Sequence, residues 1–335
     1  MNSIKKMMLS GALGCLISGM AYADGSSPQP VKPYWQDIQV VAVNKEKPRS
    51  SFMSYADRET ALTSRFEKSP YYSLLNGTWK FFFVDSYKDL PQNITDPSVN
   101  TSSWDDITVP GNWEVQGHGV AIYTNHGYEF KPRNPQPPLL PEANPVGVYR
   151  RDIEIPASWD NRDIYLHIGG AKSGLYVYLN GKEVGYSEDS KNPAEFLINK
   201  YLQPGKNVLT LKIFRWSTGS YLECQDFWRM SGIERDVFLW SQPKASIQDF
   251  RVVSTLDDTY TNGIFKLAVD LKNHTQETKN LNVGYELLDA KGNLVTSEAN
   301  DIWVSPASPQ TASFEYDLKN VAPLGVPSIR IYTNY

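Results

Sequence analysis

The stretch that decides the fold is Leu175-Tyr176-Val177-Tyr178-Leu179, then Asn180-Gly181, then Lys182-Glu183-Val184-Gly185-Tyr186. β-Branched and aromatic residues dominate both flanks and favour extended backbone. Asn-Gly between two such runs is the strongest short signal for a β-hairpin, because both residues of the turn need positive φ. The stretch therefore predicts two antiparallel strands joined by a two-residue turn.

Similar strand patterns recur on both sides of this hairpin, separated by turns and almost without helical periodicity. They cover residues 79–84, 149–155, 164–168, 208–214 and 237–240, and then 247–254, 264–271, 281–288 and 311–318. This arrangement predicts an all-β chain, with a jelly-roll domain at 70–242 and an immunoglobulin-like sandwich at 243–335. Only about five strands can be counted in the second domain, where such a sandwich has about seven. We therefore expect the second sandwich to be incomplete.

The first 23 residues have the pattern of a secretory signal peptide. Lys5 and Lys6 precede a short apolar run, and Ala21-Tyr22-Ala23 forms a small-x-small cleavage site. The apolar run is too short to span a bilayer. The sequence thus predicts an exported protein, periplasmic or extracellular, without a membrane span. Its N-terminal arm, at 24–69, would drape over the first domain.

Charge and cysteine content exclude several classes of protein. The chain has 335 residues, a formal net charge of −4 and two cysteines. An acidic chain of this kind is not expected to bind nucleic acid. Removal of the signal peptide leaves only Cys224, so no intrachain disulfide is expected, and a lone cysteine is most simply a small packed residue.

No catalytic motif of general type is present. The chain has no G-x-S-x-G elbow, phosphate-binding loop or dinucleotide fingerprint. Its four histidines lack metal-site spacing; His167 fits a packed strand position, while His118 and His126 are near enough in sequence to share one site. Aromatic residues make up 13% of the chain, which suits sugar binding because aromatic faces stack on sugar C–H groups. Composition and spacing alone reach no further than a secreted β-rich protein suited to carbohydrates.

Four segments, in order, carry a more specific resemblance. The longest is Arg215-Trp216-Ser217-Thr218-Gly219-Ser220-Tyr221-Leu222-Glu223-Cys224-Gln225-Asp226-Phe227-Trp228-Arg229-Met230-Ser231-Gly232-Ile233-Glu234-Arg235-Asp236-Val237. The others are the stretch 75–81, the pair 109–114 and 122–125, and the hairpin at 177–187. Together they resemble family-2 glycoside hydrolases, and specifically the β-galactosidase branch.

The resemblance implies that a sugar-binding jelly roll and an immunoglobulin-like domain precede a (β/α)₈ barrel. In that family the barrel carries both catalytic Glu residues and the Mg²⁺ site. The complete enzyme would cleave terminal β-D-galactosyl residues with retention, which takes two carboxyl groups about 5–5.5 Å apart. None of these residues can be assigned here, so the resemblance implies an N-terminal portion that is inactive alone. It also implies no cofactor in this chain, with Mg²⁺ and Na⁺ in the complete enzyme.

Two site residues carry over from the family by motif. Asp226, in Gln225-Asp226-Phe227-Trp228, would contact galactosyl hydroxyls and help bind Na⁺ in the complete enzyme; a carboxylate suits both tasks. Asn125, in Tyr123-Thr124-Asn125, would likewise face the β-galactoside substrate. Trp216, Trp228, Arg229 and Arg235 also lie in the stretch 215–237, and packing in the scaffold explains them better than chemistry, because an Arg stacked between aromatic rings is a common packing arrangement. Cys224 and Thr218 depart from the pattern, since each stands where the family commonly has Asp, and the metal served by Asp at position 218 is not expected.

Three alternatives remain open at the level of sequence. A β-glucuronidase or β-mannosidase shares the same domain order, although Trp216-Ser217-Thr218-Gly219-Ser220-Tyr221-Leu222-Glu223 favours a galactosidase. The chain could also be a lectin-like module that binds galactosides without cleaving them, or a purely structural fragment. The exact glycan and the oligomeric state are not determined by the sequence.

Overall fold

The computed structural model describes residues 32–131, 134–289, 291–319, 321 and 328–334. The predicted signal peptide at 1–23 lies outside these residues. Within them, no helix is long and apolar enough to cross a membrane. Helical structure in the same residues is confined to α1 (Arg58–Leu62) and short 3₁₀ turns: η1 (Tyr34–Gln36), η2 (Phe66–Lys68), η3 (Tyr87–Asp89), η4 (Glu114–Gln116), η5 (Ala157–Trp159), η6 (Asn199–Tyr201) and η7 (Thr218–Tyr221). The predicted all-β class is confirmed.

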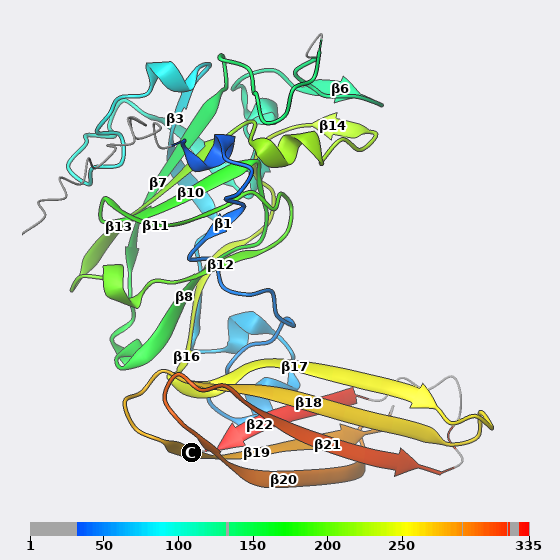
Figure 1. The fold of residues 1–335 in the computed structure, drawn as a ribbon. Coiled ribbons are helices and arrows are strands. Elements are labelled where there is room, and N and C mark those ends of the chain that lie inside the picture. The colour runs from blue at the N-terminus through cyan, green and yellow to red at the C-terminus, as the bar shows by residue number, and fades with distance from the viewer. Residues whose placement is uncertain (1–31, 132–133, 290, 320, 322–327, 335) are drawn as a thin grey trace, which may run out of the picture. The chain divides into compact units, whose positions relative to one another are not determined.

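Two sheets form the first sandwich, two small sheets accompany them, and the small sheet of β6 and β14 extends from the sandwich as a ribbon (Figure 1). The larger sheet has the order β1 (Ala42–Val43), β11 (Lys182–Ser187), β10 (Gly174–Leu179), β13 (Lys206–Phe214), β7 (Val146–Glu154), β3 (Gly77–Val84) and β4 (Asp105–Val109). The second has the order β12 (Ala194–Leu197), β8 (Arg162–Ile168), β16 (Val237–Pro243) and β2 (Tyr72–Leu74). The small sheets are β14 (Phe227–Arg229) with β6 (Ile122–Thr124), and β5 (Gly111–Asn112) with β15 (Gly232–Ile233) and β9 (Ala171–Lys172).

The predicted hairpin is the β10–β11 pair, and its turn has the expected backbone. Leu179 faces Lys182 in the register, and Asn180 and Gly181 have φ of 53° and 77°. The Asn180 side chain also donates to Asn207 at 2.8 Å. The turn is therefore fixed both by its own chemistry and by a bond to the start of the neighbouring strand β13.

Gly181→Ala is expected to destabilise the protein more than the same change at Gly205. Both glycines have positive φ, a conformation that costs other residues about 1–2 kcal/mol. A Cβ at Gly181 would additionally lie 2.9 Å from Pro97, whereas a Cβ at Gly205 meets nothing within 4 Å. Urea denaturation of both variants tests this. Equal losses of stability would show that contact with Pro97 has no cost.

The core of the first sandwich fills the space between its two sheets. Phe81, Val177 and Leu211 come from the larger sheet, and Leu166 and Leu239 from the other, all at most 1% exposed. Burial of these apolar side chains is the main stabilising contribution. In the smaller sheet the central strands β8 and β16 are largely buried on both faces, because the arm packs against the outer face.

The arm that precedes α1 contacts both sheets of the first sandwich. Trp35 is buried and stacks on Phe214, with ring centroids 4.9 Å apart. Further along, β1 pairs with β11, and Met53 packs against Tyr165 and Trp240. The contacts of Trp35 and β1 are thus with the larger sheet, and Met53 covers part of the outer face of the β12–β8–β16–β2 sheet.

The second sandwich consists of two three-stranded sheets. One has the order β17 (Ala245–Leu256), β18 (Gly263–Asn273) and β21 (Gln310–Leu318), and the other β20 (Leu294–Val304), β19 (Lys279–Leu288) and β22 (Ser328–Asn334). Its core includes Phe265, Leu267, Tyr285 and Phe314. The sequence patterns did not indicate β20, and the tail supplies the strand β22, which pairs with β19.

Candidate functional site

The structure brings the two predicted site residues to the same end of the β6–β14 ribbon. Phe227 pairs with Thr124 and Trp228 with Tyr123, so Asp226 and Asn125 are the next residues outward on the two strands. Both are exposed. Segments about a hundred residues apart in sequence thus present a carboxylate and an amide at one tip.

Hydrogen bonds orient both side chains at this tip. The Tyr123 hydroxyl donates to Asp226 Oδ1 at 2.9 Å, and this bond to the carboxylate raises the pKa of Tyr123. The Asn125 Oδ1 lies 2.7 Å from His126 Nδ1. Asp226 Oδ2 and the Asn125 NH₂ group have no partner among the described residues, so an acceptor and a donor remain open to a ligand. His118 instead packs against Phe81, with ring centroids 4.8 Å apart, and is not at this tip.

Exposed aromatic rings cover the ribbon. Tyr123, Phe227 and Trp228 are 56%, 55% and 50% exposed, and the Tyr123 and Trp228 rings meet edge-on at 5.6 Å. Rings of this kind supply apolar faces beside polar groups, which is the composition of a sugar-binding surface.

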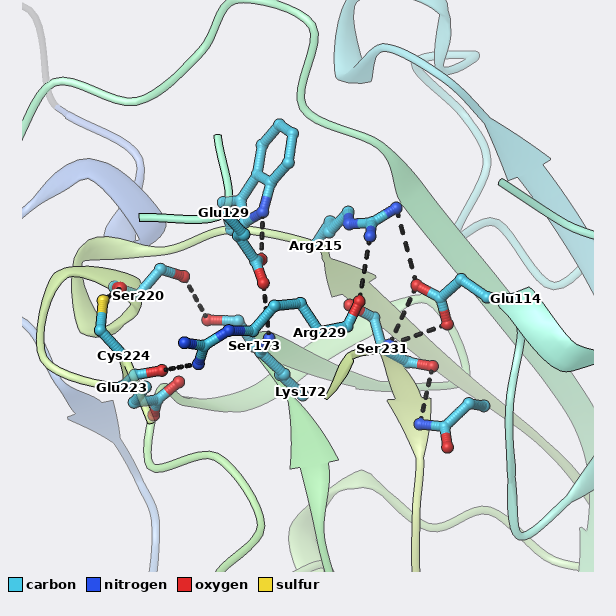
Figure 2. A network of polar contacts seen from close by, with 12 residues as sticks. Glu114, Glu129, Lys172, Ser173, Arg215, Ser220, Glu223, Cys224, Arg229 and Ser231 are labelled. Atoms are coloured by element: carbon cyan, nitrogen blue, oxygen red, sulfur yellow. Dashed lines mark hydrogen bonds and ion pairs between the residues drawn. The ribbon is translucent and has the colours of Figure 1, made fainter. Parts of the chain in front are cut away.

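The base of the ribbon is held by the buried Arg215. Its Nη2 donates to the carbonyl oxygens of Val120 and Arg229, at 2.8 and 3.1 Å. These two residues flank the ribbon strands, so one guanidinium ties both strands together. Glu114 lies 3.6 Å from Arg215 and also accepts from the backbone N–H of Ser231. Figure 2 shows Arg215 between Arg229 and Glu114.

Arg229 closes the turn that carries Asp226. Its Nη1 donates to the Glu223 carbonyl oxygen at 2.7 Å, as Figure 2 shows, which joins the two ends of the segment 223–229. Arg229 is only 4% exposed. The turn therefore rests on a buried cation.

A buried ion pair lies beside this turn. Lys172 Nζ is 3.1 Å from Glu129 Oε2, the indole N–H of Trp216 donates to the other Glu129 oxygen, and all three residues are at most 9% exposed. Burial of a charge is costly unless it is paired and hydrogen-bonded. The ion pair and the hydrogen bond from Trp216 therefore offset the cost of burying the Glu129 carboxylate.

Other carboxyl groups near the site are also largely buried. Glu188 accepts from Thr218 Oγ1 at 2.6 Å and from the Gly219 N–H at 2.8 Å, which fixes the start of η7. Burial raises the pKa of Glu114, Glu188 and Glu223, because desolvation disfavours the charged form. These buried acids thus lie under the exposed segment that carries Asp226 and help to fix its backbone.

The four residues predicted as scaffold divide into two pairs. Trp216 and Arg229 are buried and fit that role. Trp228 is half exposed on the ribbon, and Arg235 is exposed beyond β15, so the packed interpretation is wrong for both. Trp228 points outward from β14, and no second sheet in the described part of the chain packs against that face of the ribbon. His167 agrees with its prediction, since it stacks on Phe238 with ring centroids 4.2 Å apart.

The described residues offer little for a metal ion. No group of three or more His, Cys, Asp or Glu among them has the geometry of a metal site. Thr218 donates to Glu188, so that hydroxyl does not replace the carboxylate the family has there. Hard cations take about six or more oxygen ligands, and Asp226 supplies one. These residues by themselves do not fit a complete Na⁺ or Mg²⁺ site.

Cys224→Asp is expected to stabilise the protein. Arg229 Nε and Nη2 are buried without a hydrogen-bond partner among the described residues, and Cys224 lines the same packed region as Arg229. A carboxylate there can accept from the guanidinium, and hydrogen bonds to charged groups contribute about 1.5–3 kcal/mol. The expected net gain, after the cost of burying the carboxylate, is about 1 kcal/mol.

Thermal and urea unfolding of Cys224→Asp, with Cys224→Ser as the uncharged control, measure this gain. If the Asp variant is less stable than the Ser variant, repulsion from the neighbouring Glu129 and Glu223 outweighs the bond to Arg229.

Several residues that build the site were not identified from the sequence. They are Glu114, Glu129, Lys172, Glu188 and Arg215. Apart from Tyr186, which donates to Glu188 from two positions away, the hydrogen-bond and ion-pair partners of these side chains lie between 14 and 117 residues away in the chain. Glu114 and Arg215 stand within the segments 109–114 and 215–237 that carry the resemblance, which was the one available signal for them. The other three have no sequence signal, because the type of a charged residue does not reveal its burial.

Comparison with known proteins supplies the family context. The profile described as "Glycosyl hydrolases family 2, sugar binding domain" matches residues 72–243. A β-galactosidase of Priestia megaterium is 37% identical over 305 residues, which are 90% of this chain and 30% of that protein. A β-galactosidase of Halalkalibacterium halodurans is 38% identical over 267 residues, 78% of this chain and 26% of that protein. The chain thus spans less than a third of the length of these relatives.

Solved structures add a likeness of fold. The crystal structure of a Bacteroides uniformis β-glucuronidase superimposes with a TM-score of 0.60 at 20% identity, over 74% of this chain and 28% of that one. At this identity the likeness concerns the fold alone.

Proposed function

Since the chain belongs to glycosyl hydrolase family 2, we propose that it is the N-terminal portion of an exported β-galactosidase. The observation that carries this proposal is the ribbon tip, where Asp226 and Asn125 converge beside exposed aromatic rings. The named relatives with the same order of segments support a β-galactoside as substrate.

At this tip the chain's role is to bind and orient the sugar. Asp226 Oδ2 accepts a hydrogen bond from a galactosyl hydroxyl, and the Asn125 NH₂ group donates to a hydroxyl oxygen. The ring of Trp228, which lies on the same side of the ribbon as Tyr123, excludes water from the sugar C–H groups. In the complete enzyme Asp226 would also supply one oxygen ligand to Na⁺, and the other ligands would come from outside the described residues.

A catalytic barrel beyond this chain is the proposed partner of the surface around the ribbon. Exposed apolar residues surround it: Val115 (69%), Val120 (70%), Leu139 (65%) and Leu222 (86%). Clusters of exposed apolar side chains mark interaction sites more often than open surface. The barrel would supply the two carboxyl groups for retaining hydrolysis and the Mg²⁺ site, and the chain alone would not turn over substrate.

The assay of this proposal compares two purified proteins with a chromogenic β-galactoside and the matching β-glucuronide. One is this chain, and the other is a chimaera that joins it to the remaining sequence of a β-galactosidase relative. We expect no hydrolysis by the chain alone and preferential cleavage of the galactoside by the chimaera. Turnover by the chain that survives repurification would contradict the proposed division of labour. A galactoside-inactive but folded chimaera would contradict the assignment of the ribbon.

Export is tested on the intact gene product. Mass spectrometry of protein recovered from the periplasm or medium should find a mature chain that begins at Asp24. An uncleaved N-terminus in exported material would contradict the signal-peptide assignment.

A further inference from the structure

A cavity of about 300 Å³ lies where the arm meets β8, β16, β17 and β18, and it shares no residue with the ribbon. This volume is at the lower end of the range for small-molecule sites, about 300–1,000 Å³. At about 30 Å³ for each water in the liquid, it equals the volume of about ten water molecules. A monosaccharide-sized molecule is therefore the largest class of ligand that fits.

Two of the three cations that line this cavity, Arg49 and Lys272, have acidic partners. Arg49 Nε and Nη2 bind the two Glu195 oxygens at 2.9 and 2.8 Å. Lys272 lies 3.5 Å from Asp163 and donates to the Tyr165 hydroxyl. These two cations are thus neutralised within the protein and are not free to bind an anionic ligand, while the third, Lys47, is exposed.

The polar groups of the lining that have no internal partner among the described residues include both hydrogen-bond donors and hydrogen-bond acceptors. No described residue donates a hydrogen bond to the Glu46 carboxyl group, and burial raises its pKa. Asp249 uses Oδ1 for the backbone N–H groups of Ser50 and Phe250, both at 2.8 Å, which leaves Oδ2. Gln248 offers an amide that can both donate and accept.

Gln248 occupies an irregular position in the sheet. It is the extra residue of a β-bulge in β17, since Ile247 pairs with Leu271 and Asp249 with Asp270. A bulge re-aims a side chain relative to the regular strand, and bulges are over-represented next to binding sites. Here the bulged residue is one that lines the cavity.

We propose that this cavity binds a small neutral polyol of monosaccharide size through hydrogen bonds to Glu46, Gln248 and Asp249. Hydroxyl groups both donate and accept hydrogen bonds, so they match a lining that has free hydrogen-bond donors and free hydrogen-bond acceptors. A charged ligand would displace the internal ion pairs, and an apolar one would leave buried polar groups unsolvated. Stacking contributes little, because Trp240 has Arg49 over its ring at 4.4 Å and Tyr165 stacked on it at 4.8 Å. The inference does not depend on the proposed catalytic role.

Two tryptophans allow one titration to separate this cavity from the ribbon. The indole N–H of Trp240 donates to Glu195 at 3.1 Å and reports on the cavity wall, while Trp228 reports on the ribbon. The full chain, labelled with fluorotryptophan, is titrated with galactose, glucose, mannose and myo-inositol, and with the charged analogues glucosamine and glucuronate. Trp240→Phe and Trp228→Phe assign the two signals.

We expect at least one neutral polyol to shift the Trp240 signal saturably, with a Kd in the millimolar range, and charged analogues to bind at least tenfold more weakly. Glu46→Ala should raise the Kd at least tenfold, and Gln248→Trp, which fills the cavity, should abolish the shift. If Gln248→Trp does not melt like the wild type, the result for Glu46→Ala decides whether the cavity binds the polyol.

The proposal is overturned if no neutral polyol shifts the Trp240 signal at 100 mM or if a charged analogue binds more tightly. It is also overturned if Glu46→Ala binds like the wild type or if folded Gln248→Trp retains binding. A shift of Trp228 alone also overturns it and points to the ribbon.

Discussion

Asp226→Asn is expected to lower kcat/KM for a β-galactoside at least a hundredfold in the chimaera that supplies a catalytic barrel. Asn keeps the shape of the side chain but removes the charge and one acceptor. A carboxylate bonds hydroxyls through charge-assisted hydrogen bonds about twice as strong as neutral ones, and in the proposed function it would also be a ligand of Na⁺. A hundredfold loss corresponds to about 2.7 kcal/mol of transition-state stabilisation. Dependence of the rate on Na⁺ should weaken in the same variant.

The matched control for this experiment is Asp152→Asn. Asp152 is exposed and pairs with Lys206 at 2.7 Å on the first sandwich, so its loss should leave kcat/KM within twofold of the wild type. Steady-state rates of the three proteins across a series of Na⁺ concentrations give the comparison. An Asp226→Asn variant within about threefold of the wild type, about 0.65 kcal/mol, would remove Asp226 from the substrate site.

Strands could be predicted where the pattern along the chain reflects burial. The β10–β11 hairpin was predicted to the residue at its turn, because Asn180-Gly181 needs a backbone that few other pairs adopt. Strand β20 was not predicted, because all its residues except Thr296, Ile302 and Val304 are exposed. An exposed edge strand is fixed by its pairing with β19, and pairing leaves no periodic pattern in the sequence.

The residues of the site likewise divide into those that the sequence identified and those that it did not. Asp226 and Asn125 were identified because a motif holds them, and the register of β6 and β14 then brings them together. The supporting charges were not identified, because their function depends on contacts with distant segments. Glu129 and Lys172 are 43 positions apart, and only the fold makes them a pair.

These supporting charges explain how an exposed ribbon keeps a defined tip. The ribbon itself has only three paired positions, and a short two-stranded ribbon is marginal in water. Arg215 and Arg229 anchor it from below, and the Glu129–Lys172 pair lies beside Arg229. Stability of this buried network is therefore a condition for placing Asp226.

Lys172→Met is accordingly expected to destabilise the protein by about 3–5 kcal/mol, because it leaves the Glu129 carboxylate buried without its counter-ion. Glu129→Gln combined with Lys172→Met should recover most of that loss, since a neutral amide needs no counter-ion and can still accept from Trp216. The unfolding free energy of the two single variants, the double variant and the wild type, from urea denaturation, gives the coupling between the two residues. Lys206→Met is the control, because its ion pair with Asp152 is exposed and exposed pairs contribute at most about 1 kcal/mol. A double variant as unstable as Lys172→Met would mean that packing of the lysine stem, and not its charge, stabilises the base of the ribbon.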